Sequence, residues 1–184
     1  MTIENARVAG SAHIRIDMQQ NYFELFQLPV SFDVNADDLA NRHRAIIARV
    51  HPDQFANKSA MEQRVALQWA TFVNEAFDTL KSPIARAQYL LKLNAPELAV
   101  EGARVNLPHE FLMQQMQWRE DLDDAGHDEN ALLALNRQIV AARDALQAAL
   151  NQDFADEQWE TAANHVREGR FIHKLLQQIK QALP

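Results

Sequence analysis

The sequence predicts an all-α protein, and three observations lead to this prediction. Apolar residues recur at three- and four-residue spacing along most of the chain, which is the pattern of amphipathic helices. No sustained β-strand pattern is present along the chain, so no strands are expected. The six prolines fall between the periodic stretches or at the chain end, where they stop or open helices.

The chain begins with a lead, residues 1–17, that shows no periodicity and is expected to be flexible. Residues 21–28 then predict a short apolar helix or turn that Pro29 stops. A second helix is expected from residue 35 or 36 to residue 50. Its apolar stripe consists of Leu39, His43, Ile46 and Val50.

A third helix is predicted from about residue 58 to residue 80, and Ser82-Pro83 ends it. The same proline opens a fourth helix, residues 84–93. The second and third helices are joined by a short loop, which makes them an antiparallel hairpin. The apolar stripe of the third helix is Leu67, Ala70, Val73, Phe77 and Leu80, and the fourth helix packs through Ala87, Leu90 and Leu91.

Periodicity fades over residues 94–107, and Pro96, Gly102 and Pro108 indicate a boundary or a bend there. Beyond it the pattern predicts three longer helices, residues 108–124, 129–151 and 156–182. Short connections between long amphipathic helices are typical of an antiparallel three-helix bundle. We therefore expect a first domain over residues 18–93, a linker over 94–103 and a C-terminal three-helix domain over 104–184.

Turn residues support these bundle boundaries. Asp128 or Asn130 is expected to cap the second helix of the bundle. Asn151-Gln152-Asp153 is expected to separate the second helix from the third, with Asp153 as the cap of the third.

The composition excludes several classes of function. The chain has four glycines and no cysteine, so we expect no disulfide, no thiolate metal site, no Cys nucleophile and no Gly-rich phosphate loop. No metal ion and no cofactor are expected. No apolar run reaches the length of a membrane span, and the first twenty residues lack the apolar core of a signal peptide. We therefore expect a cytoplasmic protein without membrane contact.

The net charge of −7 is unevenly distributed along the chain. Residues 18–93 hold eight acidic and eight basic residues, whereas residues 94–184 hold fifteen acidic and eight basic ones. An acidic C-terminal half disfavours nucleic acid as a partner, because phosphates require clustered Lys and Arg. It suits a basic protein partner, or serves solubility alone.

His51-Pro52-Asp53 lies where the second helix must end, because proline pushes the preceding residue out of the helical region. The tripeptide admits three interpretations. As a catalytic pair, His51 and Asp53 lack a nucleophile and an oxyanion site. As a helix C-cap, they have a structural role only. With Arg42, Arg44 and Arg49 on the preceding helix, they form a basic docking surface for an acidic partner.

Several segments resemble the J-domain of DnaJ-type co-chaperones. The similarity is carried by residues 21–29, by Arg49 to Phe55 around the tripeptide, by residues 74–83 and by residues 86–91. It continues in the C-terminal half, where residues 110–122 and 166–175 resemble the HscB family, the specialised J-domain co-chaperones of iron–sulfur cluster assembly. The two halves support one another, because DnaJ-like chains in general lack this second half.

The resemblance implies a function without chemistry of its own. HscB proteins deliver an IscU-like iron–sulfur scaffold to an HscA-like DnaK-type chaperone and stimulate the ATPase of that chaperone. On this basis, His51, Pro52 and Asp53 are the stimulating motif, and Arg42 and Arg49 face the chaperone. The scaffold-binding residues carried over are Leu112, Met113, Met116, Glu120, Asp124 and Phe171. Gln54 departs from the family, which usually has Lys there.

The residues themselves leave alternatives open. Leu112, Met113, Met116 and Glu120 share one helix face, which fits either a binding surface or the core of the bundle. Trp118 and Leu122 lie elsewhere on that helix and can supply the core contacts. A J-domain protein serving another client, a small hydrolase and a helical dimerisation module remain rival functions. We expect a monomer, with a weak dimer as the alternative.

Overall fold

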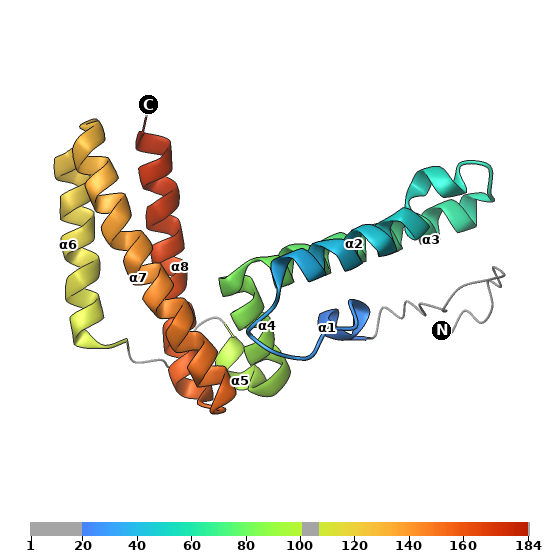
Figure 1. The fold of residues 1–184 in the computed structure, drawn as a ribbon, viewed down its shortest axis with the longest axis horizontal. Helices are drawn as coiled ribbons and strands as arrows, with labels where there is room; N and C mark the ends of the chain where they lie inside the picture. Colours follow the sequence, from blue (N-terminus) through green and yellow to red (C-terminus); the bar gives the residue numbers. More distant parts are fainter. Residues whose placement is uncertain (1–19, 101–106, 184) are drawn as a thin grey trace.

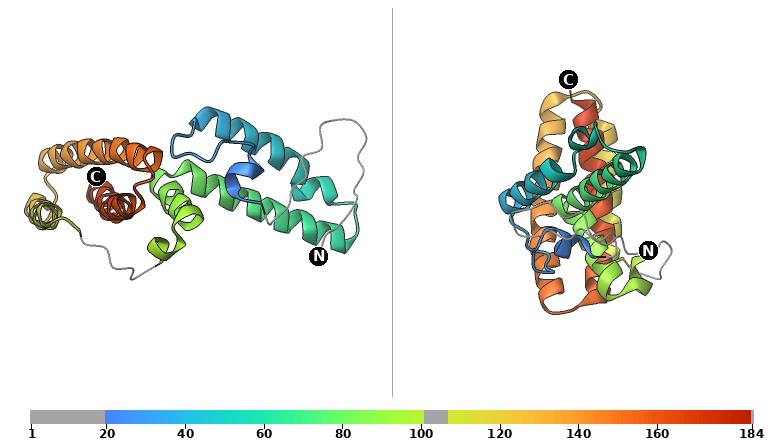
Figure 2. Two further views of the ribbon diagram at one scale, coloured as in Figure 1. Left: turned by 90° about the horizontal axis from the view of Figure 1, so that it is seen from below. Right: turned by 90° about the vertical axis from the view of Figure 1, so that its right-hand side faces the viewer.

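The computed structural model describes residues 20–100 and 107–183, and these residues form helices and turns without a β-strand. The predicted all-α fold is confirmed. A long helical hairpin extends to one side, and a bundle of three helices stands at the other (Figures 1 and 2). Two shorter helices, α4 and α5, lie where the two parts meet. The lead expected over residues 1–17 lies outside the described residues.

The N-terminal part contains α1 (Tyr22–Leu25), α2 (Ala36–Val50), the 3₁₀-helix η1 (Pro52–Phe55), α3 (Ala60–Lys81) and α4 (Pro83–Asn94). Side-chain caps explain where its helices begin. Asn35 accepts a hydrogen bond from the Asp38 amide at the start of α2. Ser59 and Glu62 form a capping box at the start of α3, and such caps satisfy amides that have no partner within the helix.

One predicted member of the α3 stripe is wrong. Leu67 is 57% exposed, and the buried face of α3 consists of Ala66, Ala70, Val73, Ala76 and Leu80. Ala66, the neighbour of Leu67, takes the buried position at this end of the stripe, and Leu67 points outward. His43 half-buries its ring on Phe77, with 4.1 Å between ring centroids, and its Nε2 lies 2.9 Å from Asn74 Oδ1.

The short helix α1 holds the base of the hairpin. The Tyr22 ring stacks on the Tyr89 ring of α4 at 4.3 Å, and its hydroxyl donates to Glu75 of α3 at 3.0 Å. Burial and the bond to the Glu75 carboxylate raise the pKa of the Tyr22 hydroxyl to about 12. The hydroxyl stays protonated at neutral pH, and Tyr22 links α1 to α3 through this hydroxyl and to α4 through its ring.

The C-terminal part contains α6 (His109–Ala125), α7 (Glu129–Ala155) and α8 (Trp159–Ala182), and α5 (Pro96–Ala99) precedes it within the expected linker. The three long helices confirm that the C-terminal half is helical, as predicted. Asp128 caps α7 by accepting hydrogen bonds from the amides of Asn130 and Ala131.

The second turn of the bundle is not where the sequence predicts it. Residues 151–153 lie inside α7, which continues to Ala155, and the turn falls at residues 156–158. Asp153 is not a cap. It is buried, and its Oδ2 lies 2.5 Å from Nδ1 of His165 on α8. The three polar residues 151–153 are typical of a turn. The Asp153 carboxylate can nevertheless be buried within a helix, because His165 on the facing helix is its hydrogen-bond partner.

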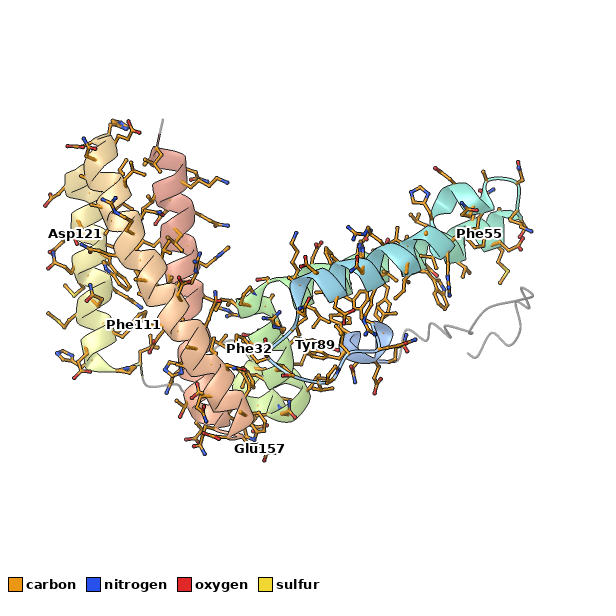
Figure 3. All side chains as sticks on the ribbon, viewed as in Figure 1. Phe32, Phe55, Tyr89, Phe111, Asp121 and Glu157 are labelled. Carbon is orange, nitrogen blue, oxygen red and sulfur yellow. The ribbon has the colours of Figure 1, made fainter. Side chains whose placement is uncertain are left out.

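The two parts of the molecule meet through a packed junction. Phe32, in the segment between α1 and α2, stacks on Phe154 of α7 with 5.6 Å between ring centroids. The buried Arg86 guanidinium lies 5.0 Å from the Phe32 ring and donates to the Leu80 carbonyl at 2.7 Å. Burial lowers the pKa of Arg86, and the nearby Asp33 carboxylate opposes this change. Figure 3 shows Phe32 between the two parts.

A glycine permits the closest approach at this junction. A Cβ atom on Gly169 of α8 would lie 2.2 Å from Cδ1 of Ile84, on α4. A side chain at this position would also come within 3.1 Å of Leu146 on α7. A larger residue at position 169 would therefore force the Ile84 side chain to move at the crossing of α4 and α8.

Candidate functional site

The His51-Pro52-Asp53 tripeptide lies at the far tip of the hairpin, away from the three-helix bundle (Figure 1). α2 ends at Val50, and His51 leaves the helical conformation at ψ 131° because proline follows. Pro52 then opens η1, where its missing amide is no loss. Figure 3 marks the same tip by Phe55, the last residue of η1.

The two polar side chains of the tripeptide face solvent. The His51 side chain is 49% exposed and that of Asp53 is 87% exposed. The Asp53 amide donates to Nδ1 of His51 over 3.3 Å, and the Gln54 amide donates to the His51 carbonyl over 2.9 Å. These local bonds orient the imidazole over the first turn of η1. The tip therefore presents a positioned imidazole and an open carboxylate.

The two predicted basic residues of α2 differ in their surroundings. Arg49 is exposed in the last turn of α2, next to the tip. Arg42 is only half-exposed: its Nε bonds Asp38 at 2.9 Å, and its Nη1 donates to the carbonyls of Phe26 and Gln27 at 3.0 Å. Arg42 thus connects α2 to the segment after α1, so it has a structural role that its sequence position does not reveal.

The outer face of α6 carries an exposed apolar patch. Leu112, Met113 and Met116 are 43%, 53% and 58% exposed, whereas Trp118 on the opposite face is buried. At 100° per residue these three side chains, together with the exposed Glu120 and Asp124, fall within about a third of the helix circumference. The structure therefore brings five of the six predicted scaffold-binding residues onto one solvent-facing surface.

Two further residues share this face and are not among those predicted from the sequence. His109 and Asp123 are exposed and fall within the same arc as Met116 and Glu120. A helical projection of residues 109–124 would have placed both on the face, because each stands at a three-, four- or seven-residue spacing from a predicted member. The face thus has an imidazole at its start and three carboxylates at its end.

Phe171, the sixth predicted residue, lies on the inner side of α6. Its ring stacks on Trp118 at 6.5 Å and meets the edge of Phe111 at 6.1 Å. The Arg119 guanidinium lies 5.4 Å from the same ring. Phe171 is therefore half-buried and joins α8 to α6, at the border of the apolar patch rather than within it. Figure 3 shows Phe111 and Asp121 on α6, at the end of the molecule opposite Phe55.

In the part of the chain that the structure describes, no three His, Cys, Asp or Glu side chains are grouped so that they could hold a metal ion. Within residues 20–100 and 107–183, none of the helices combines the length and apolarity that crossing a membrane requires.

The comparisons with known proteins agree with this arrangement. The family model described as the HSCB C-terminal oligomerisation domain matches residues 107–180. A co-chaperone protein HscB homolog from Bordetella avium is 44% identical over 165 residues, covering 89% of this chain and 98% of the relative. A second HscB homolog, from Neisseria meningitidis, is 43% identical over 164 residues, covering 88% of this chain and 98% of the relative.

Solved structures show the same architecture. Chaperone HscB from Vibrio cholerae superposes with a TM-score of 0.76 at 36% identity, covering 88% of this chain and 96% of that one. The human co-chaperone protein HscB superposes with a TM-score of 0.82 at 27% identity, covering 90% and 83%. The chain therefore belongs to the non-enzymatic HscB family, the co-chaperones of iron–sulfur cluster assembly.

Proposed function

We propose that this protein brings an IscU-like iron–sulfur scaffold to an HscA-like DnaK-type chaperone in the cytoplasm and stimulates the ATPase of that chaperone. One observation carries the proposal. Two exposed surfaces of different chemistry lie at opposite ends of one molecule, a polar tip at η1 and an apolar face on α6. The J-domain spans residues 18–93 and the scaffold-binding domain residues 104–184, with a linker over 94–103.

The chaperone binds the tip through His51, Pro52 and Asp53. The exposure of His51 and Asp53 and the local bonds that orient the imidazole support this role, because preorganised polar groups lose little entropy on binding. Arg49 adds positive charge beside the tip and attracts an acidic partner surface. Arg42 contributes charge from further back, and its bonds to Asp38 and two carbonyls keep the α2 surface in place.

The scaffold binds the outer face of α6. Leu112, Met113 and Met116 provide the apolar centre, and Met side chains adapt their shape to a partner. Glu120 and Asp124 form an acidic edge that selects a partner with basic residues at the matching end. Phe171 completes the surface from α8 and orders α6 through its contact with Trp118.

Carrying both surfaces on one chain couples the two binding events. A scaffold held on α6 is presented to the chaperone at a raised effective concentration once the tip is bound. The packed Phe32–Phe154 contact supports a defined arrangement of the two surfaces. The protein acts as a monomer, and the contact made by its C-terminal domain is with the scaffold. Concentration-dependent sedimentation of the chain alone tests this point.

The decisive experiment is an ATPase assay of the cognate chaperone with each partner omitted in turn. Full stimulation is expected to require both this protein and the scaffold. Stimulation that is independent of the scaffold would leave the tip assignment intact and would indicate another client for the α6 face. Absence of stimulation by this protein under any condition would contradict the proposed function as a whole.

A further inference from the structure

Three side chains with soft or borderline metal-binding atoms form a row on the outer face of α6. His109, Met113 and Met116 stand at positions i, i+4 and i+7, so each lies beside the next on the helix surface. All three are exposed. The row spans about 10 Å along the helix axis, with Met113 between the other two, so binding one ion requires the side chains of His109 and Met116 to turn toward Met113.

We propose that His109, Met113 and Met116 bind one Cu(I) ion. Thioether sulfur is a soft ligand that selects Cu(I), and imidazole nitrogen also suits copper. The ion would be held by one ring nitrogen of His109 and the Sδ atoms of Met113 and Met116. All three ligands are neutral when bound, and the +1 charge of the ion is favoured by the exposed carboxylates further along the same face, Glu120, Asp123 and Asp124.

An apolar binding surface does not require the sulfur atoms of Met113 and Met116. Leu112 stands on the same face and is similarly exposed, so the patch accommodates an aliphatic side chain without sulfur. Two of the five methionines of the chain nevertheless stand on this face, one and two turns from His109. Zn²⁺ and other harder divalent ions prefer thiolate, imidazole and carboxylate ligands, so two thioethers make this row selective for the monovalent ion.

Copper binding would regulate the scaffold surface, and this part of the inference rests on the proposed function. Coordination draws Met113 and Met116 together around the ion and removes both from the apolar centre of the patch. Cu(I) and the scaffold therefore compete for the same two side chains. The protein would stop delivering scaffold when Cu(I) is present.

The site itself is tested without any partner. The full chain is titrated anaerobically with Cu(I) held by bicinchoninate and kept reduced by ascorbate. We expect one ion per chain, and an affinity that falls at least about tenfold in the Met113→Leu/Met116→Leu double variant. His109→Gln should also weaken binding. Met61→Leu, which alters an exposed methionine on α3, is the matched control and should bind like the unaltered chain. Equal affinity in the double Leu variant, or no uptake by the unaltered chain, would overturn the site.

The competition is tested with a scaffold whose cysteines are replaced by serine, because cluster-binding thiolates would otherwise take the ion. Cu(I) at ten times its dissociation constant should weaken scaffold binding by the unaltered chain about tenfold. The scaffold affinity of the double Leu variant, whatever its value without copper, should not respond to Cu(I). Equal sensitivity of both chains to Cu(I) would overturn the regulation. Failure of both chains to bind scaffold without copper would instead count against the proposed function.

Discussion

The hairpin and the three-helix bundle expose their functional groups in opposite ways. The hairpin buries its apolar residues between α2 and α3 and presents polar groups at its end, where the backbone leaves the helix at His51. The bundle presents apolar groups on the side of an uninterrupted helix, where Met113 and Met116 face solvent. A tip can be positioned by a few local bonds. A helix face is positioned only by what packs against its other side, here Trp118 on Phe171.

The largest expected effect is the loss of ATPase stimulation when His51 is replaced, without a change in the stability of the fold. His51→Gln should reduce stimulation of the partner ATPase about 30-fold or more, as loss of a central interface residue does, while scaffold binding is unchanged. Because His51 is exposed and bonded only to its own turn, the free energy of unfolding should hardly change. Measured stimulation and urea unfolding check both points. His173→Gln, on the exposed side of α8, is the control and should leave stimulation intact. Normal stimulation by His51→Gln would remove the tripeptide from the proposed mechanism.

Substitutions in the proposed scaffold-binding surface should weaken scaffold binding and leave chaperone stimulation unchanged. Met113→Ala combined with Phe171→Ala is expected to lower scaffold affinity about tenfold or more, with chaperone stimulation in the absence of scaffold unchanged. Met113→Ala alone should keep the stability of the chain, because Met113 is exposed, whereas Phe171→Ala should lower it by disrupting the contact with Trp118. Titration calorimetry with the scaffold measures the affinities. Leu133→Ala changes an exposed apolar residue of α7 and serves as the control; an equal loss there would mean that the α6 face is not the binding surface.

The junction between the two parts gives a third test. Gly169→Val should lower the free energy of unfolding by about 2 kcal/mol, because the new side chain overlaps Ile84 and overpacks the crossing of α4 and α8. Ile84→Ala in the same chain should recover a large part of this loss. Urea unfolding of the two single variants and the double variant measures the coupling. If the effects of the two changes simply add, the close approach at Gly169 does not determine how the parts pack.

The smallest expected effect is the contribution of Glu168, in the three-helix bundle, to the pH dependence of stability. Partial burial raises the pKa of the Glu168 carboxyl, with Asp153 adding to the rise and His165 opposing it. The folded chain therefore holds this proton more tightly than the unfolded chain, so stability falls as pH rises from the ordinary value of 4.5 through the raised folded value. Glu168→Gln should stabilise the chain at pH 7 by a few tenths of a kcal/mol, since the group is about half exposed. The gain should vanish below pH 4.5 in thermal unfolding measured against pH. A gain that persists at low pH would have another cause.

Much of the fold follows from local patterns in the chain. Prolines and capping residues place the ends of α2, α3 and α4 within one or two residues of the predicted bounds. The sequence misplaces two residues, because packing against a neighbouring helix determines whether each of them is buried. Leu67 is outside because its neighbour Ala66 takes the buried position on α3, and Asp153 is inside because His165 supplies its partner. Both outcomes depend on which side of the helix packs against a neighbouring helix, and the spacing of residues within one helix does not determine that side.

The two candidate sites also differ in how much the sequence alone predicts about them. His51-Pro52-Asp53 was recognisable from the sequence, because proline geometry acts within the tripeptide itself. For α6, the sequence identified a shared face but left its direction open, since a row of apolar residues fits a core as well as a surface. Tertiary structure decided that Trp118 and Phe171 fill the inside, that Met113 and His109 face solvent, and that Arg42 connects two segments. Helix ends depend on neighbouring residues, whereas the direction of a helix face depends on residues far along the chain that pack against it.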